Sequence, residues 1–179
     1  MYIGMAPLIC ISTIISEEKE NNTLKALMMS NVQPFEYLIG TGFHVIVLCL
    51  IGCLIISTQA NLRFEQLISF LMFSLLGIVI STLIGATIGM ISKNQINASS
   101  ISIPLMIIFS FSPMLTMLNG KAIKITQFIY TQQIYELVAN NSILSLVSKN
   151  FISLTSCVFV TLIFFIITYK KIGIYNTNN

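Results

Sequence analysis

Residues 66–92 read QLISFLMFSLLGIVISTLIGATIGMIS, a stretch without Lys, Arg, Asp or Glu. A helix needs about 20 apolar residues to cross the hydrocarbon core of a bilayer, so this stretch predicts a transmembrane helix. Similar stretches elsewhere predict five spans in all, at about 1–16, 37–57, 66–92, 101–118 and 151–169. The first span is marginal, because a helix of that length reaches only about 24 Å. The sequence therefore predicts an all-α, polytopic helical membrane protein with a single transmembrane domain, 1–179.

The composition excludes most other classes of protein. Only 8% of the residues are charged, and the net charge of +3 is spread over the polar links without a basic cluster, so we expect no nucleic-acid partner. All four cysteines lie in apolar stretches, where a thiol packs as a small apolar group, so we expect no metal site and no cofactor. No phosphate-binding G-x-x-x-x-G-K-[ST] motif occurs. We therefore expect no catalytic residue and no ATP hydrolysis by the chain itself.

Basic residues in the links give the expected orientation. Cytoplasmic links carry the excess of Lys and Arg, and the pair Lys170-Lys171 directly follows the last span. This pair favours a cytoplasmic C-terminus. Counting back over five spans then places links 17–36 and 92–100 inside, and residue 1 and links 58–65 and 119–150 outside.

The link 17–36 holds four of the six acidic residues and has the pattern of a helix. Acidic side chains in its first turn suit the positive end of the helix dipole. An apolar stripe follows at Leu24, Leu27 and Met28, and Pro34, which lacks a backbone donor, lies beyond the helix. The pattern predicts an amphipathic cytoplasmic helix at 17–30, which is either an interfacial helix or a docking surface for a cytoplasmic partner.

Segment 14–40 resembles the stretch that follows the second membrane helix of ABC-2 type transporter permeases. The family pattern is E-x-E-x-G-T-L-x-x-L, followed by S-P-V and an acidic residue before G-K. This chain has Asn22, Asn31 and Thr41 where the family has Gly, Pro and Lys. The link 92–104 also resembles the family's link between its fourth and fifth helices, and Pro113 lies where the fifth helix of the family commonly carries a proline. The matching positions in the first segment are the acidic turn, Thr23-Leu24, Leu27, Ser30, Val32, Pro34, Glu36 and Gly40.

The resemblance implies a function and partners. It implies a permease subunit of an ABC transporter that exports a substrate across the bacterial cytoplasmic membrane, with ATP hydrolysed by a separate subunit. That subunit would dock on the 17–30 helix and the 92–100 link, and a second permease chain would complete a homodimer or heterodimer. The five spans would be helices two to six of the family, which makes the chain a truncated or split permease. The implied ATPase-coupling residues are Glu17, Glu18, Glu20, Thr23, Leu24, Leu27, Pro34 and Glu36.

Small residues recur every four positions in the span 66–92, at Gly77, Ser81, Gly85 and Gly89. This spacing lets two helix backbones approach closely in lipid. It predicts helix packing, with packing inside the chain favoured over a dimer seam.

Hydroxyl side chains in the first and fourth spans are candidates for lining the transport pathway, because the resemblance assigns that role to helices two and five of the family. A proline also frees a backbone carbonyl that nearby hydroxyls can satisfy, so local hydrogen bonding around Pro113 is the alternative. The candidate residues are Ser12, Thr13, Ser110, Ser112 and Thr116.

The long outer link 119–150 contains a second amphipathic pattern. Tyr130, Ile134, Leu137 and Val138 form one face, opposed by Gln133, Glu136 and Asn140, which predicts a short outer interfacial helix. Such a helix would gate the exit or cap the bundle. The alternative function for the whole chain is a non-transporting membrane protein, such as a toxin-immunity factor or a regulatory membrane binder.

Overall fold

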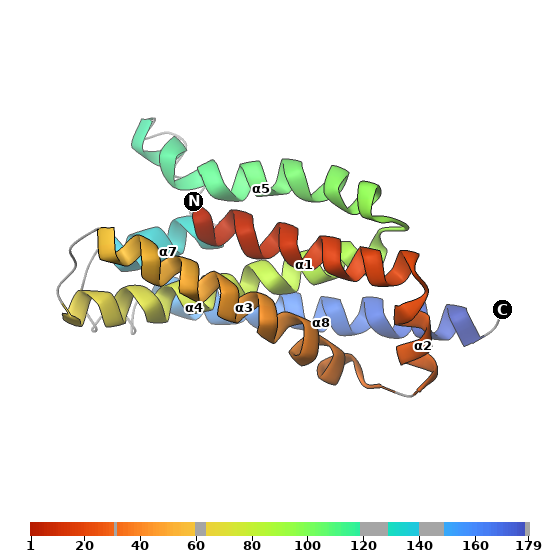
Figure 1. Cartoon of the computed structure of the whole chain (residues 1–179). Helices are drawn as coiled ribbons and strands as arrows, with labels where there is room; N and C mark the ends of the chain where they lie inside the picture. Colours follow the sequence, from red (N-terminus) through yellow and green to blue (C-terminus); the bar gives the residue numbers. More distant parts are fainter. Residues whose placement is uncertain (31, 60–63, 119–128, 140–148, 178–179) are drawn as a thin grey trace.

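The computed structural model describes residues 1–30, 32–59, 64–118, 129–139 and 149–177. Within these ranges the chain is helical and forms no strand, which confirms the all-α prediction. The long helices lie side by side; α3 runs opposite to α1, α4 opposite to α3 and α5 opposite to α4 (Figure 1). The helices are α1 (Tyr2–Glu20), α2 (Thr23–Met29), α3 (Pro34–Gln59), α4 (Phe64–Ile91), α5 (Gln95–Leu118), α7 (Tyr130–Ala139) and α8 (Lys149–Thr177).

Four of these helices are long and apolar enough to cross a membrane. Helix α1 does not meet that standard, because charged residues begin at Glu17. It nevertheless packs against α3, α4 and α5, and Leu8, Ile11 and Ile15 are fully buried. A helix covered by its neighbours needs less apolar surface of its own than one that faces lipid. The four spans are Phe35–Gln59, Gln66–Ile91, Gln95–Thr116 and Ser153–Lys170.

The bundle has two distinct ends. At one end, here called the α2 end, α1, α4 and α8 finish and α3 and α5 begin; the other, the α7 end, holds α7 and the start of α1 (Figure 1). The links 17–36 and 92–100 and the C-terminal end of the last helix thus lie together, as the predicted order of spans requires. Helices α1 and α4 run parallel, since Ile3 is near Gly77 and Ile15 is near Gly89.

The predicted helix at 17–30 is two helices, which corrects the sequence-based boundaries. Residues 17–20 continue α1, a turn occupies 21–22, and α2 begins at Thr23. Asn22 has a φ of 59°, in the left-handed region, which ends a helix and which Asn tolerates better than most residues other than Gly. The resembling family has Gly at this position. The backbone conformation therefore explains both the helix break and the residue type.

Helix α5 also begins earlier than the predicted span at 101. It starts at Gln95, and Asn94 Oδ1 accepts a hydrogen bond from the Asn97 backbone N–H at 2.9 Å. An Asn side chain that satisfies a free N–H of the first turn is a helix N-cap. Most of the predicted link 92–100 is consequently the first turn and a half of a membrane-length helix.

Helix α7 is buried more deeply than an interfacial helix would be. Tyr130, Ile134 and Leu137, on the predicted apolar face, are buried within the bundle, and Gln133, predicted on the opposite polar face, is only 6% exposed. Its Nε2 donates to Ser153 Oγ on α8 at 3.1 Å. The assignment of Gln133 to an exposed face was therefore wrong, because a partner on another helix allows an amide to be buried. Residues 119–128 and 140–148 of the predicted outer link, Asn140 included, lie outside the described residues.

Candidate functional site

The candidate site is the α2 end, where Lys19 and Glu20 join the two links that the sequence predicted to be cytoplasmic. Lys19 Nζ donates to the backbone carbonyls of Met90, at 2.6 Å, and Ser92, at 2.7 Å. These carbonyls end α4 and lack helical partners, so the lysine caps the helix. Burial lowers the pKa of Lys19. Glu20 Oε2 accepts from the Gln95 backbone N–H at 3.2 Å, at the start of α5.

A second set of contacts ties α1 to α3 and α8. The Tyr37 hydroxyl donates to Glu18 Oε2 at 2.5 Å, and its ring centroid lies 5.8 Å from that of Tyr169. The Tyr169 hydroxyl donates to the Val32 carbonyl at 3.1 Å. Both rings are at least 95% buried. The end of α1 is therefore joined to α3 through Tyr37 and, by way of the Tyr37–Tyr169 ring contact, to α8.

Helix α2 is held to the bundle by Leu24, which is 2% exposed and belongs to the same apolar cluster as Ile15 and Tyr37. Thr23 Oγ1 donates to the Glu18 carbonyl at 2.8 Å and fixes the turn that precedes α2. The opposite face of the helix is open, with Met29 71% exposed. The short helix thus offers one face to the surroundings while the other is anchored.

The structure divides the predicted coupling residues into two groups. Leu24 is buried, and the half-buried Glu18 bonds to the buried Tyr37, so both make contacts within the bundle. Pro34 begins α3, and Glu36 Oε2 accepts from the Gln33 backbone N–H at 3.1 Å, which satisfies a free donor before that helix. The exposed members of the predicted set are Glu17, Glu20, Thr23, Leu27 and Glu36.

Lys25 and Met29 are also exposed on α2, and the prediction omitted them from the site. Leu24 faces the bundle, and on a helix with a period of 3.6 residues Lys25 and Met29 then lie toward the open side of α2. The sequence contained that periodicity, but it did not say which of the apolar residues faced the bundle.

The small residues of α4 face α1. A Cβ added to Gly85 would lie 2.5 Å from the Leu8 carbonyl oxygen, and one added to Gly89 would lie 2.9 Å from that of Ser12. At Gly77 the nearest groups are the side chains of Ile3 and Ile134. At Gly85 and Gly89 the two backbones are in direct contact, so glycine is required there for space.

Ser81, the fourth member of the stripe, acts as a donor. Pro7 has no N–H, which leaves the Ile3 carbonyl of α1 without its helical partner. Ser81 Oγ lies 2.7 Å from that carbonyl oxygen and 2.8 Å from the Tyr130 hydroxyl. The Gly77 carbonyl oxygen of α4 itself also lies 2.9 Å from Ser81 Oγ. Because carbonyls only accept, the single hydroxyl proton of Ser81 is directed at these two oxygens, of which Ile3 is the nearer, and Ser81 Oγ accepts from Tyr130. One side chain of α4 thereby joins α1 and α7.

The same arrangement occurs at Pro113 of α5. This proline frees the Phe109 carbonyl, and Thr131 Oγ1 from α7 donates to it at 2.5 Å. Ser112 Oγ lies 2.8 Å from Thr131 Oγ1 and is its donor. Hydroxyls from a neighbouring helix thus replace the missing backbone bonds, and Thr131, which the sequence did not single out, is the principal partner.

The other predicted pathway residues also lie in packing contacts. The Ser102 hydroxyl donates to Ser12 Oγ at 2.8 Å, between α5 and α1, and Thr116 Oγ1 lies 3.2 Å from Gln132 Oε1 of α7. Thr13 Oγ1 donates within its own helix, to the Ile9 carbonyl at 3.0 Å, and Ser110 Oγ lies 3.4 Å from the Met1 carbonyl. The contacts of Ser12 and Thr116 join helices, whereas that of Thr13 lies within α1, and a role in lining the pathway stays a prediction.

Among the described residues, no group of three or more His, Cys, Asp or Glu side chains gathers as a metal site would require. Cys49 and Cys53 are buried in the apolar cluster around α1 and α3, and Cys10 is exposed. The two buried thiols occupy packing positions.

Comparison with known proteins identifies a family. The model of the family described as ABC-2 family transporter protein matches residues 1–170. No curated protein matches the chain, and no solved structure matches it. The matched region includes every residue whose contacts at the α2 end are described above. The chain belongs to the ABC-2 family of transporter proteins.

Proposed function

We propose that this chain is the transmembrane permease subunit of an ABC exporter. A separate subunit hydrolyses ATP and docks at the α2 end, and the substrate leaves across the cytoplasmic membrane. The observation that carries the proposal is the pair of contacts from neighbouring residues of α1, Lys19 to the end of α4 and Glu20 to the start of α5. These contacts bring the links 17–36 and 92–100 together into one surface, and the family resemblance assigns ATPase docking to both links.

The composition of this surface supports a protein partner. Exposed carboxylates at Glu17 and Glu20 lie beside the open face of α2, where Leu27 is 37% and Met29 71% exposed. Apolar anchors bordered by charged groups are typical of protein interfaces. Members of this family work with an ATP-binding subunit in general, and such a subunit is the partner that we assign here.

Movement of the bound subunit would reach the membrane helices through Leu24 and Glu18. Leu24 is the apolar anchor of α2, and Glu18 is bonded to Tyr37, whose ring packs against Tyr169. A displacement of α2 therefore changes the positions of α1, α3 and α8 together. We propose this route as the coupling path, and a second permease chain as the other half of the transporter.

The proposal is tested by co-purification of the ATP-binding subunit from native membranes in mild detergent. Glu17 is the best position to change, because its side chain is exposed, whereas Glu18 and Glu20 make contacts inside the chain. Glu17→Lys should release the ATP-binding subunit, and Glu17→Asp, which keeps the charge, should retain it. Equal retention by the two variants would remove Glu17 from the interface.

If the unmodified chain retains no ATP-binding subunit at all, the transport assignment fails. The alternative of a regulatory or toxin-immunity membrane binder would then take its place. Retention with ATPase activity in the purified complex would exclude that alternative.

A further inference from the structure

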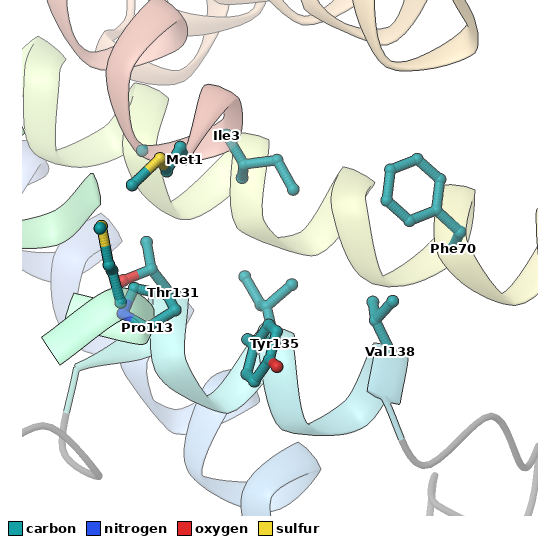
Figure 2. A pocket seen from close by; sticks show the side chains of 10 residues that line it. Met1, Ile3, Phe70, Pro113, Thr131, Tyr135 and Val138 are labelled. Atoms are coloured by element: carbon teal, nitrogen blue, oxygen red, sulfur yellow. The ribbon is translucent and has the colours of Figure 1, made fainter. Parts of the chain in front are cut away.

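The α7 end contains a cavity of about 380 Å³ that the proposed coupling surface does not use. Its walls come from four helices, α1, α4, α5 and α7. Figure 2 shows Ile3 of α1 on one side, Thr131, Tyr135 and Val138 of α7 on the other, and Phe70 of α4 and Pro113 of α5 at its two ends. A cavity of this size is within the range of small-molecule sites.

The lining selects the chemistry of a ligand. Among the described lining residues none is Asp, Glu, Lys, Arg or His, and only Thr131 and Tyr135 have side-chain oxygens. The Thr131 hydroxyl proton is already donated to the Phe109 carbonyl. Apart from the α-amino group of Met1, the described lining residues carry no charge, so a cationic ligand would lose its hydration here without gaining a counter-charge. An uncharged, mainly apolar molecule loses nothing comparable and gains the burial of its surface.

The rim gives a ligand access. Met114 is 45% exposed and Tyr135 is 38% exposed, so the cavity is open between α5 and α7. Its wall also includes Pro113, next to the Thr131 contact that holds α7 against α5. A molecule bound here would touch the junction that fixes α7.

We infer that this cavity is a binding site for a small, uncharged, apolar molecule. The inference concerns binding by the chain itself and does not need the ATP-binding subunit, so it can fail while the proposed function stands. An acyl chain of a membrane lipid is the competing occupant, and the experiment separates the two.

The test uses the full chain in phosphatidylcholine vesicles with an uncharged trifluoromethyl aryl diazirine, followed by photolysis and peptide mapping. Labelling of Phe70 and of residues 130–138 should saturate and should be lost on adding excess of the same aryl compound without the diazirine. Labelling of the exposed residue Phe159 of α8, which is 68% exposed, should rise in proportion to probe concentration. Proportional labelling at both places would overturn the inference.

Two variants make the test specific to the cavity. Met114→Trp places a large ring at the rim and should abolish saturable labelling, whereas Leu115→Trp, at a neighbouring position that is 50% exposed and outside the lining, should preserve it. Val138→Phe fills the cavity from α7 and should act as Met114→Trp does. If both filling variants keep the saturable labelling, or if Leu115→Trp loses it equally, the site is wrong.

Two further probes test the ligand class. The same aryl diazirine carrying a trimethylammonium group should give no saturable labelling, and saturable labelling by it would overturn the assignment to uncharged ligands. A phosphatidylcholine with a diazirine in its acyl chain should not displace the small probe from residues 130–138. Displacement would make a lipid chain the occupant and would overturn the small-molecule inference.

Discussion

Replacing Gly85 by Ala is expected to force α1 away from α4. The new Cβ would lie 2.5 Å from the Leu8 carbonyl oxygen and would also meet the Ile11 side chain. Neither group can turn aside, because one is helix backbone and the other is fully buried. The clash must therefore be relieved by moving the helix.

The size of the effect follows from the geometry. Ordinary contact begins at 3.4 Å, so the Leu8 oxygen must retreat by about 0.9 Å, the difference between 3.4 and 2.5 Å. Adding one carbon to a packed core typically costs about 1–3 kcal/mol. Ala also favours a helix over Gly by about 1 kcal/mol. Gly40→Ala has the same propensity gain and nothing within 4 Å of its Cβ, so the difference between the two variants isolates the clash.

The free energy of unfolding can be measured by titrating the purified protein in mixed micelles with sodium dodecyl sulfate and following helicity. Gly85→Ala should be less stable than Gly40→Ala by about 1–3 kcal/mol. Gly89→Ala should lie between them, because the required shift from the Ser12 oxygen is smaller, from 2.9 to 3.4 Å. If Gly85→Ala is as stable as Gly40→Ala, the close contact of α1 with α4 is wrong.

Three other changes test local features by the same titration. Ser81→Ala should lower the free energy of unfolding by about 1–3 kcal/mol, because the α1 carbonyl that Pro7 frees loses its donor. The control Ser100→Ala removes an exposed hydroxyl that bonds only within its own helix, and it should change that free energy by no more than about 0.5 kcal/mol. Equal losses in the two variants would contradict the role of Ser81. Asn22→Gly should leave stability nearly unchanged and Asn22→Ala should cost about 1–2 kcal/mol, so a more stable Ala variant would contradict the left-handed turn. Tyr37→Phe should cost about 1.5–3 kcal/mol by removing the bond to Glu18, and combining it with Glu18→Gln should add little; full additivity would show that the two groups do not interact.

Much of the fold could be predicted from the sequence. Uncharged runs such as 66–92 locate the long helices, and their number and order place the links 17–36 and 92–100 at one end. The four-residue spacing from Gly77 to Gly89 also indicated where helix backbones meet. These features depend only on the local composition and on the spacing of residues along the chain, and both can be obtained from a single sequence.

The break at Asn22 could not be predicted from periodicity. The acidic turn and the apolar stripe before and after it fit one continuous helix, and Asn is tolerated inside helices. The informative signal was the glycine that the resembling family has at this position, because a left-handed φ is the usual reason for a glycine there. The φ of 59° gives that signal its physical meaning.

The polar contacts of α7 were also beyond the sequence. Pro7 and Pro113 require donors for the carbonyls that they free, but the chain alone does not say which helix supplies them. Thr131 and Ser81 do so only because α7 and α4 pack against α5 and α1. Gln133 could be buried for the same reason, since its partner Ser153 comes from another helix, α8, that packs against α7.

The central claim is that the α2 end receives an ATP-binding subunit, and site-specific photo-crosslinking in native membranes tests it most directly. A photoreactive amino acid at Met29, on the open face of α2, should give an adduct with an ATP-binding subunit. The same amino acid at Phe159, which is 68% exposed on the membrane span of α8, should give none. An absence of the adduct from Met29, or equal adducts from both positions, would contradict the account.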